Sequence, residues 1–322
     1  MNRSSVHLSS LRPSRLLGGL AGLGSWAVIT LAVAGFAHGA APSDLASDGD
    51  YRREIEAWRA DRETRLRSDT GWLTVAGLFW LKEGKNTLGN DPRSDVLLPP
   101  GVGLPQTGFL LFSEGEVQLK VFPDATVLLG DQAVTSRTLA DDASGAADLL
   151  KVGRVTFHLI RRQDRLGIRL RDPESQARRE FAGCRWYPVD PAHRVEAKFV
   201  PYDPPRTIAI PNVLGQVSEE SCPGYVEFQI DGQTARLEPT AEPGDESWSF
   251  IFSDGTSGVA TYGGGRFLES DPAQNGVVVL DFNRAYNPPC VFTPYATCPL
   301  PPESNRLTVE IRAGELNYGE HH

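Results

Sequence analysis

Alternation of apolar and polar residues with a period of two, repeated along the chain after Gly71, is the feature that most constrains the fold. About a dozen short stretches have this pattern and are rich in β-branched or aromatic residues, with Gly, Pro, Asp and Asn between them. The stretch IDGQ at residues 230–233 has the composition of a tight hairpin turn. Short strands at near-regular spacing predict an all-β, mostly antiparallel protein, built as sandwiches or barrels. The predicted strands are residues 117–122, 125–129, 154–160, 166–172, 195–200, 206–213, 225–230, 233–239, 247–254, 277–282 and 306–311.

A single convincing helix precedes these strands. In residues 45–68, Ile55 and Trp58 mark one apolar face, and Asp48 or Asp50 can cap the N-terminus. The strands that follow are expected to form a β-sandwich over residues 70–172. A second antiparallel β domain, a sandwich or a barrel that carries a proline-rich cysteine loop, is expected over residues 180–318.

The first 40 residues have the composition of a secretory signal. Arg3, Arg12 and Arg15 precede an apolar run, and the small residues Ala37 and Gly39 suit a signal-peptidase site. The alternative is an uncleaved anchor, because about twenty apolar residues can span a bilayer. In both cases the bulk of the protein is exported, and the predicted location is periplasmic or secreted.

The net charge limits the kinds of partner. Loss of the leader removes three arginines and no acidic residue, so the formal net charge moves from −9 to −12. A strongly acidic protein repels phosphate backbones and anionic membrane surfaces. We therefore expect no nucleic-acid partner and no membrane contact beyond the leader, which leaves a small molecule as the partner to consider.

The sequence has no motif for nucleotide or metal chemistry. It contains no phosphate-binding loop, no dinucleotide fingerprint and no nucleophile elbow. His158 lies in a predicted strand and His193 in a predicted turn, and neither belongs to a metal-binding pair. The sequence therefore predicts neither a metal nor a cofactor.

The first β region resembles the forkhead-associated β-sandwich. The resemblance lies in EGKNTLGNDPRSDVLLPPG (residues 83–101), ATVLLGDQAV (125–134) and LLKVGRVTFHLI (149–160). Those domains read phosphothreonine through an arginine, a Ser-x-x-His and an Asn-Gly turn. Here Asn90 stands at the arginine position, Leu129-Gly130 stands at the turn, and no Ser-x-x-His follows. The resemblance implies an architecture without its phosphate-binding residues.

A second resemblance runs from about Tyr51 to Tyr318. Five stretches in order carry it: GWLTVAGLFWLKEGKNTLG, FAGCRWYPVD, FVPYDPPRTIAIPNVLGQ, TYGGGRFL and LDFNRAYNPPCVFTPYATCPLPPESNRLTVEIRAGE. Together they are similar to the bacterial family called domain of unknown function 1684. The resemblance implies a β-rich fold and no established activity.

The four cysteines predict disulfides, because their number is even and the chain has an export leader. Cys290 and Cys298 enclose a seven-residue loop and are the candidate pair. Pairing of Cys184 with Cys222 has no local support. The alternative for Cys290 is a reactive thiolate, which would need a basic neighbour.

A polar set surrounds the proline-rich stretch at residues 281–302 and is the candidate ligand site. Alternation places Asp281 and Asn283 on one face of a strand, and Arg266 is a candidate partner for Asp281 in a structural or ligand-directed contact. Alternatively, these groups satisfy the backbone of a loop that prolines deprive of N–H donors. The candidate ligand-binding residues are Tyr262, Arg266, Asp281, Asn283, Tyr286, Asn287, Tyr295 and Asn305.

Three functions remain open at the level of the sequence. The favoured hypothesis is a periplasmic protein that binds a small ligand, or an accessory protein, that uses the C-terminal β domain. The alternatives are a hydrolase that uses carboxylates such as Asp281 and Glu315, and a purely structural or interaction module. Whether the protein is an enzyme is left open.

Overall fold

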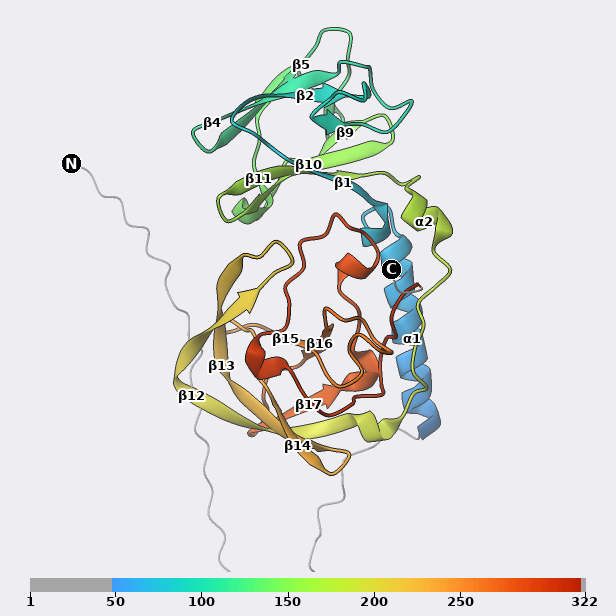
Figure 1. Ribbon diagram of the computed structural model, residues 1–322, viewed down its shortest axis with the longest axis vertical. Helices are drawn as coiled ribbons and strands as arrows, with labels where there is room; N and C mark the ends of the chain where they lie inside the picture. The colour runs from blue at the N-terminus through green and yellow to red at the C-terminus, as the bar shows by residue number, and fades with distance from the viewer. Residues whose placement is uncertain (1–47, 320–322) are drawn as a thin grey trace, which may run out of the picture. The chain divides into compact units, whose positions relative to one another are not determined.

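The structure, a computed structural model, describes residues 48–319 of the 322-residue chain (Figure 1). The predicted leader therefore lies outside the described residues. Helix α1 (Asp48–Arg67) confirms the predicted N-terminal helix, and a second short helix, α2 (Gln176–Glu180), was not predicted. Most of the remaining structure is antiparallel β-sheet, as predicted. Single turns of 3₁₀-helix are η1 (Trp72–Thr74), η2 (Asp142–Ser144), η3 (Pro191–His193), η4 (Phe282–Arg284), η5 (Pro289–Val291) and η6 (Glu303–Asn305).

Two sheets in the first β region pack face to face. One has the strand order β1-β11-β10-β9-β6-β7 and the other β3-β2-β4-β5-β8. Leu88, Leu110 and Leu119 of one sheet share a buried core with Phe157 and Ile168 of the other. The strands are β1 (Val75–Trp80), β2 (Gly84–Gly89), β3 (Val96–Leu97), β4 (Gly108–Ser113), β5 (Glu116–Val121), β6 (Leu128–Leu129), β7 (Gln132–Ala133), β8 (Ser136–Thr138), β9 (Leu150–Val152), β10 (Val155–Arg162) and β11 (Arg165–Arg171).

The second β region has a core of its own. A four-stranded sheet, β14-β13-β12-β17, and the pair β15-β16 share a buried cluster that includes Phe228, Phe250 and Phe282. The predicted hairpin turn joins β13 to β14, where Asp231 and Gly232 both have positive φ. The strands are β12 (Arg194–Pro211), β13 (Val217–Ile230), β14 (Gln233–Leu237), β15 (Trp248–Phe252), β16 (Arg266–Ser270) and β17 (Val277–Asp281).

Two strand predictions need correction. Residues 195–200 and 206–213 were predicted as separate strands, but β12 runs through both and pairs with β13. The register shifts between Pro201 and Arg206, where prolines without an N–H interrupt the ladder. Residues 306–311 form no regular strand. The Leu307 backbone N–H donates to the Ser253 carbonyl and the Val309 carbonyl accepts from the Gly255 N–H, so isolated backbone hydrogen bonds hold this segment in place of a strand ladder.

Helix α1 is fixed to the second β region by buried polar contacts. The Tyr51 hydroxyl donates to Asp281 Oδ1 at 2.7 Å, and Arg62 Nε donates to Glu315 Oε2 at 2.8 Å. Figure 1 shows α1 running beside the C-terminal segments of the chain. Over residues 48–319, no helix combines the length and apolar character needed to cross a membrane.

Candidate functional site: an arginine-lined pocket

The outer face of the first sheet carries an unusual group of cationic side chains. Alternation along β10 and β11 turns Phe157 and Ile168 into the sandwich core and leaves His158, Arg162 and Arg169 on the opposite face. His158 and Arg169 are directly opposite each other in the antiparallel pair. A pocket borders this face of the sheet.

The pocket has a volume of about 400 Å³, within the range of small-molecule sites. It draws residues from α1, from β11 and β10, and from the proline-rich loop after β17. Its charged and polar lining residues are Arg62, Arg162, Arg169, Asn287, Thr297 and Cys298. Its apolar and aromatic lining residues are Leu66, Trp72, Phe267, Tyr286, Pro289, Phe292 and Pro299.

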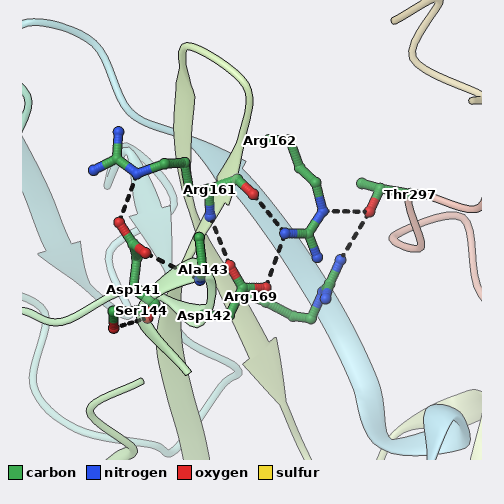
Figure 2. A network of polar contacts seen from close by, with 8 residues as sticks. All are labelled: Asp141, Asp142, Ala143, Ser144, Arg161, Arg162, Arg169 and Thr297. Atoms are coloured by element: carbon green, nitrogen blue, oxygen red, sulfur yellow. Dashed lines mark hydrogen bonds and ion pairs between the residues drawn. The ribbon is translucent and has the colours of Figure 1, made fainter. Parts of the chain in front are cut away.

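Thr297 joins the two arginines of the sheet (Figure 2). Its hydroxyl accepts from Arg162 Nε at 3.0 Å and from Arg169 Nη2 at 3.3 Å. Arg162 also forms an ion pair with Asp142 at 2.9 Å, and the second carboxylate oxygen of Asp142 accepts from the Arg161 backbone. Arg162 is thus neutralised and held in place from the side of the first β region.

Arg169 differs from Arg162 because it has no acidic partner. Arg169 is only 4% exposed, and across residues 48–319 no carboxylate lies within ion-pair distance of its guanidinium. Its Nε is buried without a hydrogen-bond acceptor. Burial, with a further contribution from Arg162, lowers the pKa of Arg169 to about 10, which leaves it charged at neutral pH. The pocket therefore contains a buried positive charge that forms no ion pair with a carboxylate of the described residues.

Arg62 enters the pocket from α1 and is neutralised. It pairs with Glu315, which is fully buried, at 2.8 Å, and Nη2 donates to the Asn287 carbonyl at 2.9 Å. The guanidinium lies 4.5 Å from the centroid of the Tyr286 ring, in cation–π contact. These contacts explain why Tyr286 and Asn287 lie at the pocket.

The cysteines are present as thiols, so the predicted disulfides are not formed in this structure. Cys290 and Cys298 are nevertheless adjacent: the Cys290 backbone N–H donates to the Cys298 Sγ at 3.2 Å. A hydrogen bond from the Cys298 thiol lowers the pKa of Cys290, and the same bond together with burial raises the pKa of Cys298. Cys222 donates to the Gly224 carbonyl at 3.1 Å, in a contact local to β13.

The structure does not form the predicted contact between Arg266 and Asp281. Arg266 is fully buried and pairs with Asp254 at 2.6 Å, and it also donates to the Ile311 carbonyl at 3.0 Å. Asp281 instead accepts from Tyr51 of α1. Each of the two charges has a structural partner, so this part of the predicted ligand site consists of internal braces.

The other predicted residues divide between braces, surface and pocket. Asn283 exchanges hydrogen bonds with the Asp190 backbone, and Asn305 does the same with Glu238. Tyr295 is 37% exposed and Tyr262 is partly buried. Of the eight predicted residues, the pocket brings together Tyr286 and Asn287. The two carboxylates considered for hydrolysis, Asp281 and Glu315, are both held by buried partners.

Sequence reasoning missed the residues that define the pocket, namely Arg62, Trp72, Arg162, Arg169 and Thr297. One signal was available: LGIRLRD places Arg169 and Arg171 on the face opposite Ile168 and Leu170, which is unusual for the buried middle of a strand. No local signal indicates which loop covers that face. Among residues 48–319, no group of three or more His, Cys, Asp or Glu side chains is placed to bind a metal ion.

Comparison with known proteins gives a family and no activity. No curated protein matches the chain. An uncharacterized protein of Haloarcula marismortui, whose structure was solved by NMR in solution, is 32% identical over 45% of this chain and 81% of its own, with a TM-score of 0.38. Residues 179–316 match the family described as "Protein of unknown function (DUF1684)". Of the five stretches on which the resemblance to this family was based, the first, at residues 71–89, lies outside the matched region. The part of the chain from residue 179 to residue 316 belongs to the DUF1684 family.

Proposed function

We propose that this protein binds a small anionic molecule in the arginine-lined pocket. The observation that carries the proposal is Arg169, a buried guanidinium in a pocket of about 400 Å³ with no carboxylate partner among the described residues. An unpaired buried cation is costly for folding, so its presence in a cavity is best explained by a ligand that neutralises it. Thr297 and Arg162 supply further hydrogen-bond donors beside it.

Export is part of this proposal. The basic and apolar leader supports a periplasmic or secreted protein, and an oxidising compartment would favour a disulfide between Cys290 and Cys298. The negative net charge of the chain keeps large polyanions away, whereas the local positive charge of the pocket attracts a small anion. The net charge therefore argues against a polyanion such as a nucleic acid, whereas the arginines of the pocket support a small anion as the partner.

Calorimetric titration with benzoate, used as a small anionic probe, tests the proposal. Wild-type protein should bind the probe, and Arg169→Gln should weaken binding by at least about tenfold, the effect of losing one charged hydrogen bond of ~1.5 kcal/mol or more. Arg306→Gln, at an exposed arginine outside the pocket, is the matched control and should bind as wild type does.

The stability of Arg169→Gln gives a second readout. Because the variant removes a buried charge that no acid neutralises, its melting temperature should equal or exceed that of wild type. Loss of binding together with a large loss of stability would make Arg169 a structural residue. Equal binding by the wild type and Arg169→Gln would refute the proposed site.

A further inference from the structure

We propose that the oxidation state of Cys290 and Cys298 sets the affinity of the pocket, with the disulfide as the state of high affinity for anions and the dithiol as the state of low affinity. This inference rests on the proposed function and assigns a regulation to the same anion site. Three features support it: the place of the two cysteines in the pocket wall, the contact between them, and the charge that the dithiol carries.

The two cysteines lie at the ends of one wall of the pocket. Cys298 itself lines the pocket. Thr297, the residue before it, accepts hydrogen bonds from Arg162 at 3.0 Å and from Arg169 at 3.3 Å. The segment 289–299 supplies a group of lining residues, namely Pro289, Phe292, Thr297, Cys298 and Pro299. A disulfide would therefore close the segment that holds the arginines of the sheet, and a wall that is fixed before binding loses less entropy when a ligand binds.

The contact between the cysteines allows a disulfide to form within this wall. The Cys290 backbone N–H donates to Cys298 Sγ at 3.2 Å, and the two thiols are hydrogen-bonded to each other. Cys290 is partly exposed, whereas Cys298 is buried. A disulfide reagent from solvent therefore reaches Cys290 first, and Cys298 lies beside it to complete the exchange.

The oxidation is a thiol–disulfide exchange with a small disulfide such as oxidised glutathione. The Cys290 thiolate attacks one sulfur of the reagent, a mixed disulfide forms, and one glutathione thiolate leaves. Cys298 then gives its proton to that thiolate and attacks the Cys290 sulfur, which releases the second glutathione thiolate. The two electrons that the protein loses reduce the disulfide of the reagent to two glutathione molecules.

The dithiol carries a negative charge within electrostatic range of Arg169. A hydrogen bond from the Cys298 thiol, with a smaller contribution from the positive charge of Arg169, lowers the pKa of Cys290 to about 7, although burial opposes this shift. At pH 8 the pair therefore holds a thiolate, and this thiolate competes with an anionic ligand for the positive charge of Arg169. A disulfide is uncharged, so oxidation removes the competing anion.

Calorimetric titration with benzoate at pH 8 tests the inference on purified wild-type protein in its two states. One sample is treated with oxidised glutathione and the other with dithiothreitol, and both are desalted before titration. Peptide mapping confirms the bridge between Cys290 and Cys298 in the first sample and free thiols in the second. The oxidised protein should bind benzoate at least about fivefold more tightly than the reduced protein, which is the lower end of the coupling found between two sites.

Benzoate should in turn stabilise the disulfide, because coupling between two equilibria is reciprocal. A fivefold difference in affinity makes the midpoint potential of the pair about 20 mV more negative at saturating benzoate. Redox titration in mixtures of reduced and oxidised dithiothreitol, with and without benzoate, measures this shift. A disulfide that affects only the stability of the fold would have the same potential in both titrations.

The control variant Cys290→Ser cannot form the bridge and leaves every lining residue of the pocket in place. It should bind benzoate equally after both treatments, whereas the double variant Cys184→Ser, Cys222→Ser should keep the difference. Equal affinities of oxidised and reduced wild type, tighter binding by the reduced protein, failure of the bridge to form, or a difference that persists in Cys290→Ser would overturn the inference and leave the proposed anion site intact. Absence of benzoate binding in both states would overturn both.

Discussion

Three buried arginines show how differently one residue type is used in this protein. Arg266 and Arg62 each have a buried carboxylate partner, Asp254 and Glu315, and both brace the second β region. Arg169 is also buried, has no such partner among the described residues, and lines a cavity. A buried ion pair that loses one member leaves an uncompensated charge, whereas an unpaired charge that is removed leaves none. Substitution at these sites should therefore have opposite effects on stability.

Arg266→Leu should lower the free energy of unfolding by about 3–5 kcal/mol, because it leaves the fully buried Asp254 without its cation. Urea denaturation followed by circular dichroism measures the change. Arg306→Leu, at an exposed position, is the control and should change stability by no more than ~0.5 kcal/mol. A loss below ~1 kcal/mol for Arg266→Leu would show that the pair is not a brace.

His158 makes stability depend on pH. Burial, and then the positive charges of Arg169 and Arg171, lower its pKa to about 4, with Arg162 adding to this effect and Asp142 opposing it. Between pH 6.5 and about 4 the unfolded chain binds a proton at this site that the folded chain does not, so stability falls as the pH falls through this window and the loss is complete below it.

The matched variant His158→Gln isolates this contribution. Between pH 7 and pH 4 the free energy of unfolding of the wild type should fall by about 1–2 kcal/mol more than that of the variant. This value is smaller than the full pKa shift of His158 implies, because the ring is partly exposed. Chemical denaturation at both values of pH measures the difference. Identical pH dependence in the two proteins would contradict the assignment.

Among the elements, the proline-rich loop after β17 has the largest effect on the site. It carries Asn287, Phe292 and Thr297 to the outer face of the first sheet, and Thr293 Oγ1 donates to the Val75 carbonyl of β1 at 3.1 Å. Prolines fix φ along this loop, so its path costs less entropy on folding than a flexible loop of equal length would. The thiols of Cys290 and Cys298 lie next to each other in the same loop.

Oxidation of Cys290 and Cys298 by oxidised glutathione should form a disulfide between them, with release of two reduced glutathione molecules. Closing a loop of nine residues should raise the free energy of unfolding by about 2–3 kcal/mol on the chain-entropy estimate. Melting temperatures in oxidised and reduced buffer measure the gain. It should persist in the double variant Cys184→Ser, Cys222→Ser and disappear in Cys290→Ser; a gain that survives Cys290→Ser would assign it to another pair.

For the molecule as a whole, the pocket depends on segments from both β regions. Arg162 and Arg169 belong to the first region, whereas Thr297 and Asn287 follow the last strand of the second, and Arg62 comes from α1. Each region has a separate hydrophobic core. The site therefore requires the two regions to pack against each other.

Expression of the full chain with its leader in a bacterium tests the proposed export. The protein should be recovered from the periplasm without roughly its first 40 residues, because a signal peptidase removes the leader. Mass spectrometry of the N-terminal peptide identifies the cleavage point. Recovery in the membrane fraction of a chain that begins at Met1 would instead show an anchored protein.

The sequence by itself determined the local structure of this protein. The period-two pattern, the single amphipathic helix and the IDGQ turn are consequences of neighbouring residues. The structure has α1 and the β13–β14 hairpin at the predicted places, and it has strands at the predicted places other than residues 306–311. Tertiary structure decided the partners of the charged residues. Tyr51 forms a hydrogen bond with Asp281, 230 residues away in the sequence, and Arg162 forms one with Thr297, 135 residues away. The periodicity of a strand predicts on which face a side chain lies, but it does not predict which distant segment packs on that face. For this reason the pocket could be identified only from the tertiary structure.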